Sequence, residues 1–142
     1  MKKQAFTLIE VLIAIILVGL AIASLLGANL AFTRANGSGV ELSTAEFLTE
    51  QIREQTVTMP FTPTLVTLVN TYPNNTTVTY KPPHDSQGIP LTAYPAYSQN
   101  ITGRYVSASD LSTVSGSATP FYRITVDIYH NTEKISSACW IR

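Results

Sequence analysis

The residue of this chain whose chemistry most needs an explanation is Glu10, a carboxylate at the head of an apolar segment. The 23 residues that follow it, Val11 to Thr33, carry no charge. An ionised acid costs on the order of a few kcal/mol in the middle of a bilayer and less near its boundary, and such a group marks a function with a specific partner. The chemistry open to Glu10 is therefore ion pairing with a positive group.

The other reactive side chains do not form a catalytic arrangement. Both His84 and His130 fall in expected turns, without an acid or a serine beside them in a recognisable motif. His84-Asp85 could serve as a base and the acid that orients it, but next to two prolines the pair is more typical of an exposed loop. The single cysteine, Cys139, excludes an intrachain disulfide and is more typical of a small packed hydrophobe than of a nucleophile. We expect no enzymatic activity.

Composition argues against a metal, another cofactor or a nucleic acid partner. The three aspartates, Asp85, Asp110 and Asp127, lie far apart and none forms a D-x-D cluster of the kind that binds calcium. Nine basic residues balance nine acidic ones. The basic residues of the C-terminal part are too few and too scattered to claim a nucleic acid-binding stripe; they are Lys81, Arg104, Arg123, Lys134 and Arg142.

The element that must position Glu10 is a helix long enough to cross a membrane. At about 1.5 Å per residue, Val11 to Thr33 would span about 34 Å, against about 30 Å for a hydrocarbon core. Lys2 and Lys3 precede this segment and only Arg34 follows it closely. The positive-inside rule then keeps the N-terminus cytoplasmic and sends the remainder outward, as in a single-pass membrane protein.

Two other kinds of segment are compatible with this pattern. One is a secretory signal peptide, because Ala21-Ile22-Ala23 before Ser24 is an A-x-A cleavage site. The other is a plain membrane anchor. Both tolerate an acid at position 10 and neither needs one. A secreted binding domain, released by cleavage after Ala23, therefore stays open as the alternative function.

The stretch from Lys2 to Leu12, KKQAFTLIEVL, closely resembles the class III signal of the type IV pilin and type II secretion pseudopilin family. Within the family, the chain is most like a minor pilin or minor pseudopilin. The resemblance implies a prepilin peptidase that cuts between Ala5 and Phe6 on the cytoplasmic side and methylates the new amine of Phe6. Residues 1–5 would be a cytoplasmic leader that carries Lys2 and Lys3. Ala5 departs from the glycine that the family nearly always has there.

The resemblance also gives Glu10 a partner. As the fifth residue of the mature chain, it would pair with the N-terminal ammonium of Phe6, in its own chain or in a neighbouring subunit of a fibre. Such a pair offsets much of each charge's desolvation cost and fixes axial register, since a slip leaves both charges unpaired. The implied partners are the prepilin peptidase and methyltransferase, other pilin or pseudopilin subunits and an inner-membrane assembly platform. The implied location is the bacterial inner membrane, then a pilus or a periplasmic pseudopilus.

Small residues recur every four positions along the expected transmembrane and assembly helix, residues 6–35. This spacing lets membrane helices approach closely. Each step drifts by about 40°, so the set forms a winding groove suited to several neighbours rather than one flat face. Apolar spans are also simply rich in glycine and alanine, and that alternative stays open. The residues of the set are Gly19, Ala23, Gly27, Ala31 and Ala35.

Residues 36–57 are expected to continue this helix after a kink or a brief break near residues 36–39. Gly37 and Gly39 weaken a helix, and two capping-box patterns, Ser38 to Glu41 and Ser43 to Glu46, follow. The continuation is amphipathic, and its apolar face should lie on a small sheet. Its acids form a solvated face or contact adjacent subunits. The apolar face consists of Ala45, Leu48 and Ile52, and the acids are Glu46, Glu50 and Glu54.

Residues 58–142 read as an extracytoplasmic, β-rich head. The stretch FYRITVDIYH alternates apolar and polar residues, as a half-buried antiparallel strand does, and it begins a C-terminal hairpin over residues 121–142. Four prolines make residues 82–98 a variable loop. The fold predicted is α+β and pilin-like: a long N-terminal helix, transmembrane in its first half, packs through its second half on a small antiparallel sheet. The candidate strands are Leu65–Asn70, Thr76–Lys81, Ile101–Ser107, Tyr122–Tyr129 and Ile135–Ile141.

Overall fold

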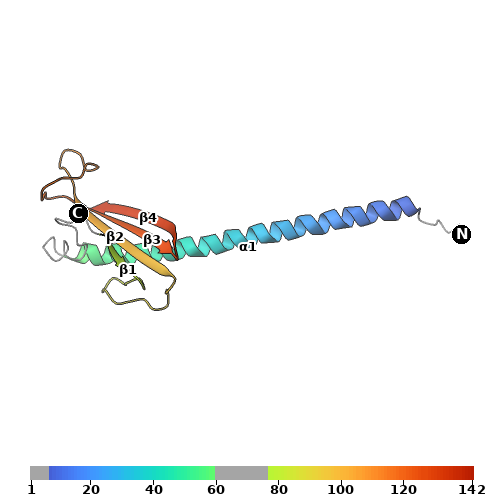
Figure 1. Ribbon diagram of the computed structural model, residues 1–142, viewed down its shortest axis with the longest axis horizontal. Coiled ribbons are helices and arrows are strands. Elements are labelled where there is room, and N and C mark those ends of the chain that lie inside the picture. The colour runs from blue at the N-terminus through green and yellow to red at the C-terminus, as the bar shows by residue number, and fades with distance from the viewer. Residues whose placement is uncertain (1–6, 60–76) are drawn as a thin grey trace. The chain divides into compact units, whose positions relative to one another are not determined.

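A computed structural model of the chain describes residues 7–59 and 77–142, and it divides into two compact units. The N-terminal unit ends at Val40, and the C-terminal unit is Glu41–Arg142. The fold is α+β, as predicted, with a long N-terminal apolar helix and a four-stranded antiparallel sheet (Figure 1). The elements are α1 (Leu8–Thr58), β1 (Val78–Tyr80), β2 (Tyr97–Tyr105), β3 (Tyr122–His130) and β4 (Glu133–Ile141).

Helix α1 runs without interruption through residues 36–39, so the break expected there is wrong, while the kink stays a prediction. Gly37 and Gly39 each cost only about 1 kcal/mol relative to alanine. Proline would end the helix by removing a backbone donor, but α1 contains none. Because adding residues to an existing helix is far more favourable than starting a new one, the helical residues on both sides carry it through. The capping-box patterns at Ser38 and Ser43 therefore lie inside the helix.

The strands follow one another in sheet order β1-β2-β3-β4, and every neighbouring pair is antiparallel. Strand β3 alternates buried and half-buried residues along its length, and with β4 it forms the C-terminal hairpin. Strand β2 begins four residues earlier than expected, at Tyr97, so the irregular segment after Lys81 ends at Ala96. The strand expected at Leu65–Asn70 lies outside the described residues.

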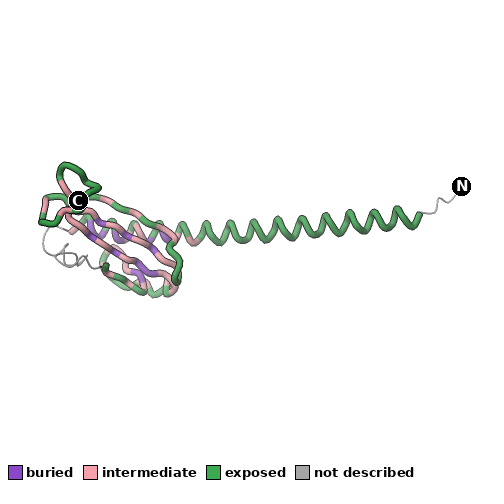
Figure 2. Tube along the Cα trace, turned by 45° about the horizontal axis from the view of Figure 1, so that its top comes forward, coloured by how far each residue is buried: buried purple, intermediate pink, exposed green. Residues whose placement is uncertain are grey.

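The core of the C-terminal unit lies between α1 and one face of the sheet, where the buried residues gather in Figure 2. The predicted apolar face of the helix is confirmed, because Ala45, Leu48 and Ile52 are fully buried. Tyr122 of β3 packs directly over Gly103 of β2, where an added Cβ would overlap the Tyr122 ring and hydroxyl. The sheet contributes Ile101, Tyr122, Ile124, Val126 and Ile128 to this core.

Polar contacts join the irregular segments to α1. The amide of Gln99, which is fully buried, donates to the carbonyls of Leu48 and His84 and accepts from the His84 backbone N–H. The Arg142 guanidinium donates to the carbonyls of Thr56 and Met59, which would otherwise lack helical partners at the end of α1. These contacts hold opposite ends of the sheet against α1.

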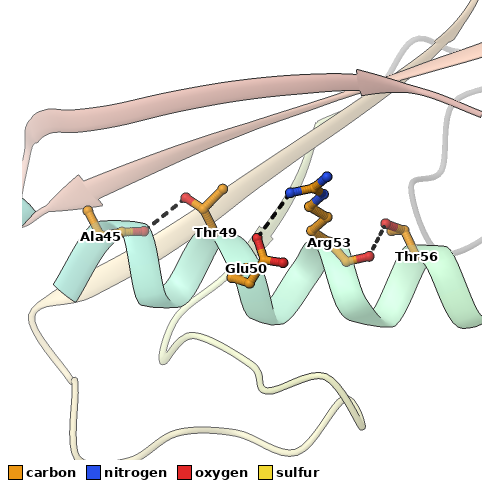
Figure 3. Close-up of polar contacts among 5 residues, drawn as sticks. All are labelled: Ala45, Thr49, Glu50, Arg53 and Thr56. Carbon is orange, nitrogen blue, oxygen red and sulfur yellow. Dashed lines mark hydrogen bonds and ion pairs between the residues drawn. The ribbon is translucent and has the colours of Figure 1, made fainter. Parts of the chain in front are cut away.

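Polar side chains of α1 in the C-terminal unit make contacts within the helix itself, and Figure 3 shows some of them. Thr49 and Thr56 donate their hydroxyl protons to carbonyls of their own helix, Ala45 and Arg53 respectively. Arg53 forms an exposed ion pair with Glu50, with 3.5 Å between Nη1 and Oε2. Such contacts are local and leave the acidic side of the helix accessible.

Candidate functional site

The first turn of α1 is closed by a reciprocal contact between Thr7 and Glu10. The Glu10 Oε2 atom accepts hydrogen bonds from the Thr7 backbone N–H and hydroxyl, both at 3.1 Å. In return the Glu10 N–H donates to Thr7 Oγ1 at 3.4 Å. This is a capping box, in which a threonine and a glutamate three positions later satisfy backbone donors that the helix cannot. Glu10 therefore has a local partner within its own chain.

The helix that follows is exposed along the whole N-terminal unit, and no residue from 7 to 40 is buried (Figure 2). Within the described residues, α1 is the one helix whose length and composition suffice to cross a membrane, and its most apolar window has a mean hydropathy of 2.8. An exposed apolar surface of this extent costs free energy in water, at roughly 25 cal/mol for each Å². The segment therefore needs a lipid or protein environment.

The small residues of α1 leave open space along the helix. A Cβ atom added at Gly19 or Gly27 would meet nothing within 4 Å, and Ala23 and Ala31 are exposed. Residues 7–59 and 77–142 therefore place no atom in the space beside the two glycines. The close helix packing predicted for these positions stays a prediction, because it concerns other copies.

Four of the predicted site residues, Lys2, Lys3, Ala5 and Phe6, lie outside the described residues. The cleavage site and the expected pair between Glu10 and the Phe6 amine therefore stay predictions. The structure adds the capping partner of Glu10, which was not among the predicted contacts. A threonine followed three residues later by a glutamate, just before an apolar run, is the signal that could have found it.

Comparison with known families identifies the same region. Residues 1–26 match the family described as Prokaryotic N-terminal methylation motif. The chain therefore carries a prokaryotic N-terminal methylation motif. The motif covers all of the predicted leader, the predicted methylation position Phe6, and Glu10. It is consistent with the type IV pilin and pseudopilin family. Comparison of the chain with curated proteins and with solved structures gives no match.

His84 and Asp85, which could have served as a base and the acid that orients it, make contacts that shape the loop after β1. His84 lies in a loop, as expected, but it is half-buried instead of exposed and stacks on Tyr80, with 4.0 Å between ring centroids. The Gln99 amide holds its backbone, a contact that local sequence could not reveal. The Asp85 carboxylate accepts from the backbone N–H groups of Gln87 and Ile89. These contacts give both residues a role in shaping the loop.

Three further expectations need correction. His130 ends β3 instead of lying in a turn, and its Nδ1 is 3.2 Å from Glu41 Oε1. Cys139 is exposed on β4 instead of packed. Arg104 and Arg123 are not scattered, because they lie directly opposite each other on β2 and β3.

Among residues 7–59 and 77–142, no group of three or more His, Cys, Asp or Glu side chains could hold a metal ion.

One carboxyl group is strongly perturbed. Hydrogen bonds from the side chains of Ser112 and Thr113 and from the Ser112 backbone lower the pKa of Asp110 to about 2. The group is fully exposed and all its donors lie within its own turn. Perturbed acids often mark functional sites, but here the cause is a local turn in which the ionised acid is the hydrogen-bond acceptor.

Proposed function

We propose that this chain is the precursor of a structural subunit of a type IV pilus or a type II secretion pseudopilus. One observation carries the proposal: a methylation motif leads directly into an exposed helix that has a single acid at its head and no other charge through Thr33. The subunit is noncatalytic. It waits in the bacterial inner membrane with its N-terminus in the cytoplasm, and it is then drawn into a helical fibre.

The proposed division of labour follows the chain. Residues 1–5 are a leader that the prepilin peptidase removes between Ala5 and Phe6, and the same enzyme methylates the Phe6 amine. Residues 6–35 span the membrane and later form the fibre core. Residues 36–57 continue the same helix, and residues 58–142 form the extracytoplasmic head. Alanine is small enough for a tight peptidase subsite, so Ala5 is compatible with cleavage although the family nearly always has glycine there.

Glu10 acts in two stages under this proposal. In the newly inserted chain it caps α1 through Thr7, which keeps its carboxylate hydrogen-bonded. In the fibre it pairs with the Phe6 ammonium of a neighbouring subunit, since an unpaired acid in an apolar core is costly. If a subunit slipped along the fibre axis, its Glu10 carboxylate and the neighbouring ammonium would separate and both charges would be unpaired. The pair therefore selects a single axial register.

The helix surface supports close packing in that core. Gly19, Ala23, Gly27 and Ala31 place small side chains along a winding line, which lets several neighbouring helices approach. The apolar surface of the helix meets a similar environment in lipid and in a bundle of like helices. The alignment of the subunits is therefore specified by the fit of the helix surfaces and by the charge pair. This is the reason that a single carboxylate suffices to align the subunits.

The test is the N-terminus of the mature protein. The full chain is produced in cells with and without an active prepilin peptidase, and its N-terminus is identified by mass spectrometry of the membrane fraction. The proposal predicts a chain that begins at N-methylated Phe6 only when the peptidase is active. A chain that begins at Ser24 in both cells would instead support the secreted binding domain.

Two matched variants sharpen this test. Ala5→Leu places a bulky side chain in the peptidase subsite and should leave the precursor uncut. Ala23→Leu makes an equal change at the alternative cleavage site and should leave the methylated product unchanged. The opposite pattern, with Ala23→Leu blocking maturation and Ala5→Leu having no effect, would contradict the proposal.

A further inference from the structure

Two arginines lie side by side on the face of the sheet that points away from α1. Arg104 of β2 and Arg123 of β3 are direct cross-strand partners. Successive side chains of a strand alternate between faces, and their neighbours Gly103 and Ile124 lie on the buried side. Like charges directly opposite each other destabilise an antiparallel pair. This placement is therefore expected to be compensated by an anion.

The described residues do not supply that anion. Among them, no ion pair within 4 Å involves either Arg104 or Arg123. Arg123 is oriented by one hydrogen bond, from Nη1 to the Ser112 carbonyl at 3.0 Å. The nearby Asp110 carboxylate is already the acceptor for side-chain donors of its own turn. The pair is thus a part-exposed basic site in which one arginine is held in place, and its acidic partner lies elsewhere.

The same unit presents a matching acidic surface on α1. Glu46, Glu50 and Glu54 recur at four-residue intervals, and all three are exposed. Glu50 has an intrahelical partner in Arg53, with both side chains more than half exposed. In the part of the chain that the structure describes, no ion pair involves Glu46 or Glu54. These three acids are called the acidic edge below.

The two surfaces agree in spacing. Successive members of the acidic edge lie about 6 Å apart along the helix axis. Directly opposed residues of antiparallel strands have Cα atoms about 4.5–5.5 Å apart. Two neighbouring glutamates can therefore each meet one arginine, and the planar guanidinium can bind a carboxylate through two hydrogen bonds.

We propose that Arg104 and Arg123 of one copy dock on the acidic edge of a second copy of this chain. The inference rests on the proposed function, and it adds the contact between neighbouring heads in the fibre. The two surfaces are different parts of one subunit, on opposite sides of its sheet and helix layers. A contact between unlike surfaces repeats from copy to copy and builds an open helical assembly rather than a closed dimer. This agrees with a fibre subunit and favours a second copy as the occupant.

The test is a charge swap in the full chain, expressed in cells that supply the peptidase and the assembly platform. Fibre yield is measured by immunoblotting of sheared material against total mature protein. Arg104→Glu with Arg123→Glu should lower the yield by at least about tenfold, because two attractive pairs become repulsive. Reversal of the acidic edge to arginine should do the same. The chain that carries both reversals should recover most of the wild-type yield.

A charge-matched control changes two basic residues outside the pair. Lys81→Glu with Lys134→Glu alters the net charge equally and should leave the yield unchanged. If the variant with Arg104→Glu and Arg123→Glu does not accumulate, Arg104→Gln with Arg123→Gln is used in its place. It should also lower the fibre yield, because it removes both positive charges. An unchanged yield in the arginine variants would overturn the proposal. A loss that the swap fails to restore would also overturn it, because the partner would not be the acidic edge.

Cross-linking separates this proposal from the fibre function. In a Cys139→Ser background, Thr125→Cys and Arg53→Cys lie beside the two surfaces and leave their charges in place. A short bismaleimide should join this pair between copies in membranes, whereas it should not join Thr92→Cys with Arg53→Cys. If wild-type chains make no fibres but the first pair still cross-links, the contact stands and the fibre function fails. If fibres form and the first pair does not cross-link, the contact is overturned and the fibre function stands.

Discussion

Gln99 allows a sharp test of how the irregular segment 82–96 is held on α1. Its side chain is fully buried and makes three hydrogen bonds, at 2.7 Å from the His84 N–H and 3.0 Å to each of the Leu48 and His84 carbonyls. Gln99→Leu keeps the approximate volume and removes all three. The Leu48 carbonyl keeps its helical partner, but both backbone groups of His84 lose theirs.

The magnitude follows from those two groups. A fully buried backbone group left without a partner costs about 1–3 kcal/mol, and the two groups of His84 are only part-buried, so we take about 1–2 kcal/mol for each. We therefore expect Gln99→Leu to lower the free energy of unfolding of the C-terminal unit by about 2–4 kcal/mol. For a unit of about this size, such a loss lowers the melting temperature by on the order of 10–20 °C.

Trp140, the single tryptophan, packs partly buried against the core and reports unfolding of the unit by fluorescence. Thermal melts of the full chain in detergent would compare Gln99→Leu with Asn100→Leu. Asn100 is the next residue of β2 and accepts one exposed hydrogen bond, from Thr79, so its loss should cost about 1 kcal/mol or less. Equal melting temperatures for the two variants would refute the reasoning.

Two further predictions concern packing and titration. Gly103→Ala should destabilise the C-terminal unit by about 1–3 kcal/mol because its Cβ would overlap the Tyr122 ring. The same melts should show almost no change for Gly116→Ala, where a Cβ meets nothing within 4 Å. Equal effects of the two substitutions would contradict the packing of Tyr122 over Gly103. The lowered pKa of Asp110 means that its ionised form contributes stability above the ordinary aspartate range and loses it as pH falls toward about 2. A carbon-detected NMR titration should show a midpoint near 2 that rises in Ser112→Ala, and an ordinary midpoint in the wild-type chain would contradict the contacts.

Local pattern was sufficient for much of the fold. The alternation in FYRITVDIYH predicted β3, and the spacing of Ala45, Leu48 and Ile52 predicted the buried face of α1, because each depends only on the period of one element. The break at residues 36–39 was wrong because helix-weakening residues were weighed alone. The continuity of α1 depends on both flanking segments, which a short window does not include.

The features that sequence could not predict depend on contacts between distant segments. Gln99 falls between the predicted loop and the predicted strand, and its three hydrogen bonds depend on Leu48 and His84, which are distant in sequence. Arg104 and Arg123 looked scattered because only the register of β2 on β3 brings them together. Register follows from pairing across the whole sheet. By contrast, the capping of α1 by Thr7 is local, and a search for capping boxes would have found it.

The central claim is that the charge of Glu10, and not its role in the capping box, aligns subunits in a fibre. Glu10→Gln tests this most directly, because glutamine can fill the same capping position but carries no charge. Thr7→Val is the matched control, since it removes the capping hydroxyl and keeps the carboxylate. Fibre yield is measured relative to mature, methylated chain. The account predicts normal maturation with almost no fibres for Glu10→Gln and substantial fibres for Thr7→Val. Wild-type yield from Glu10→Gln would contradict it.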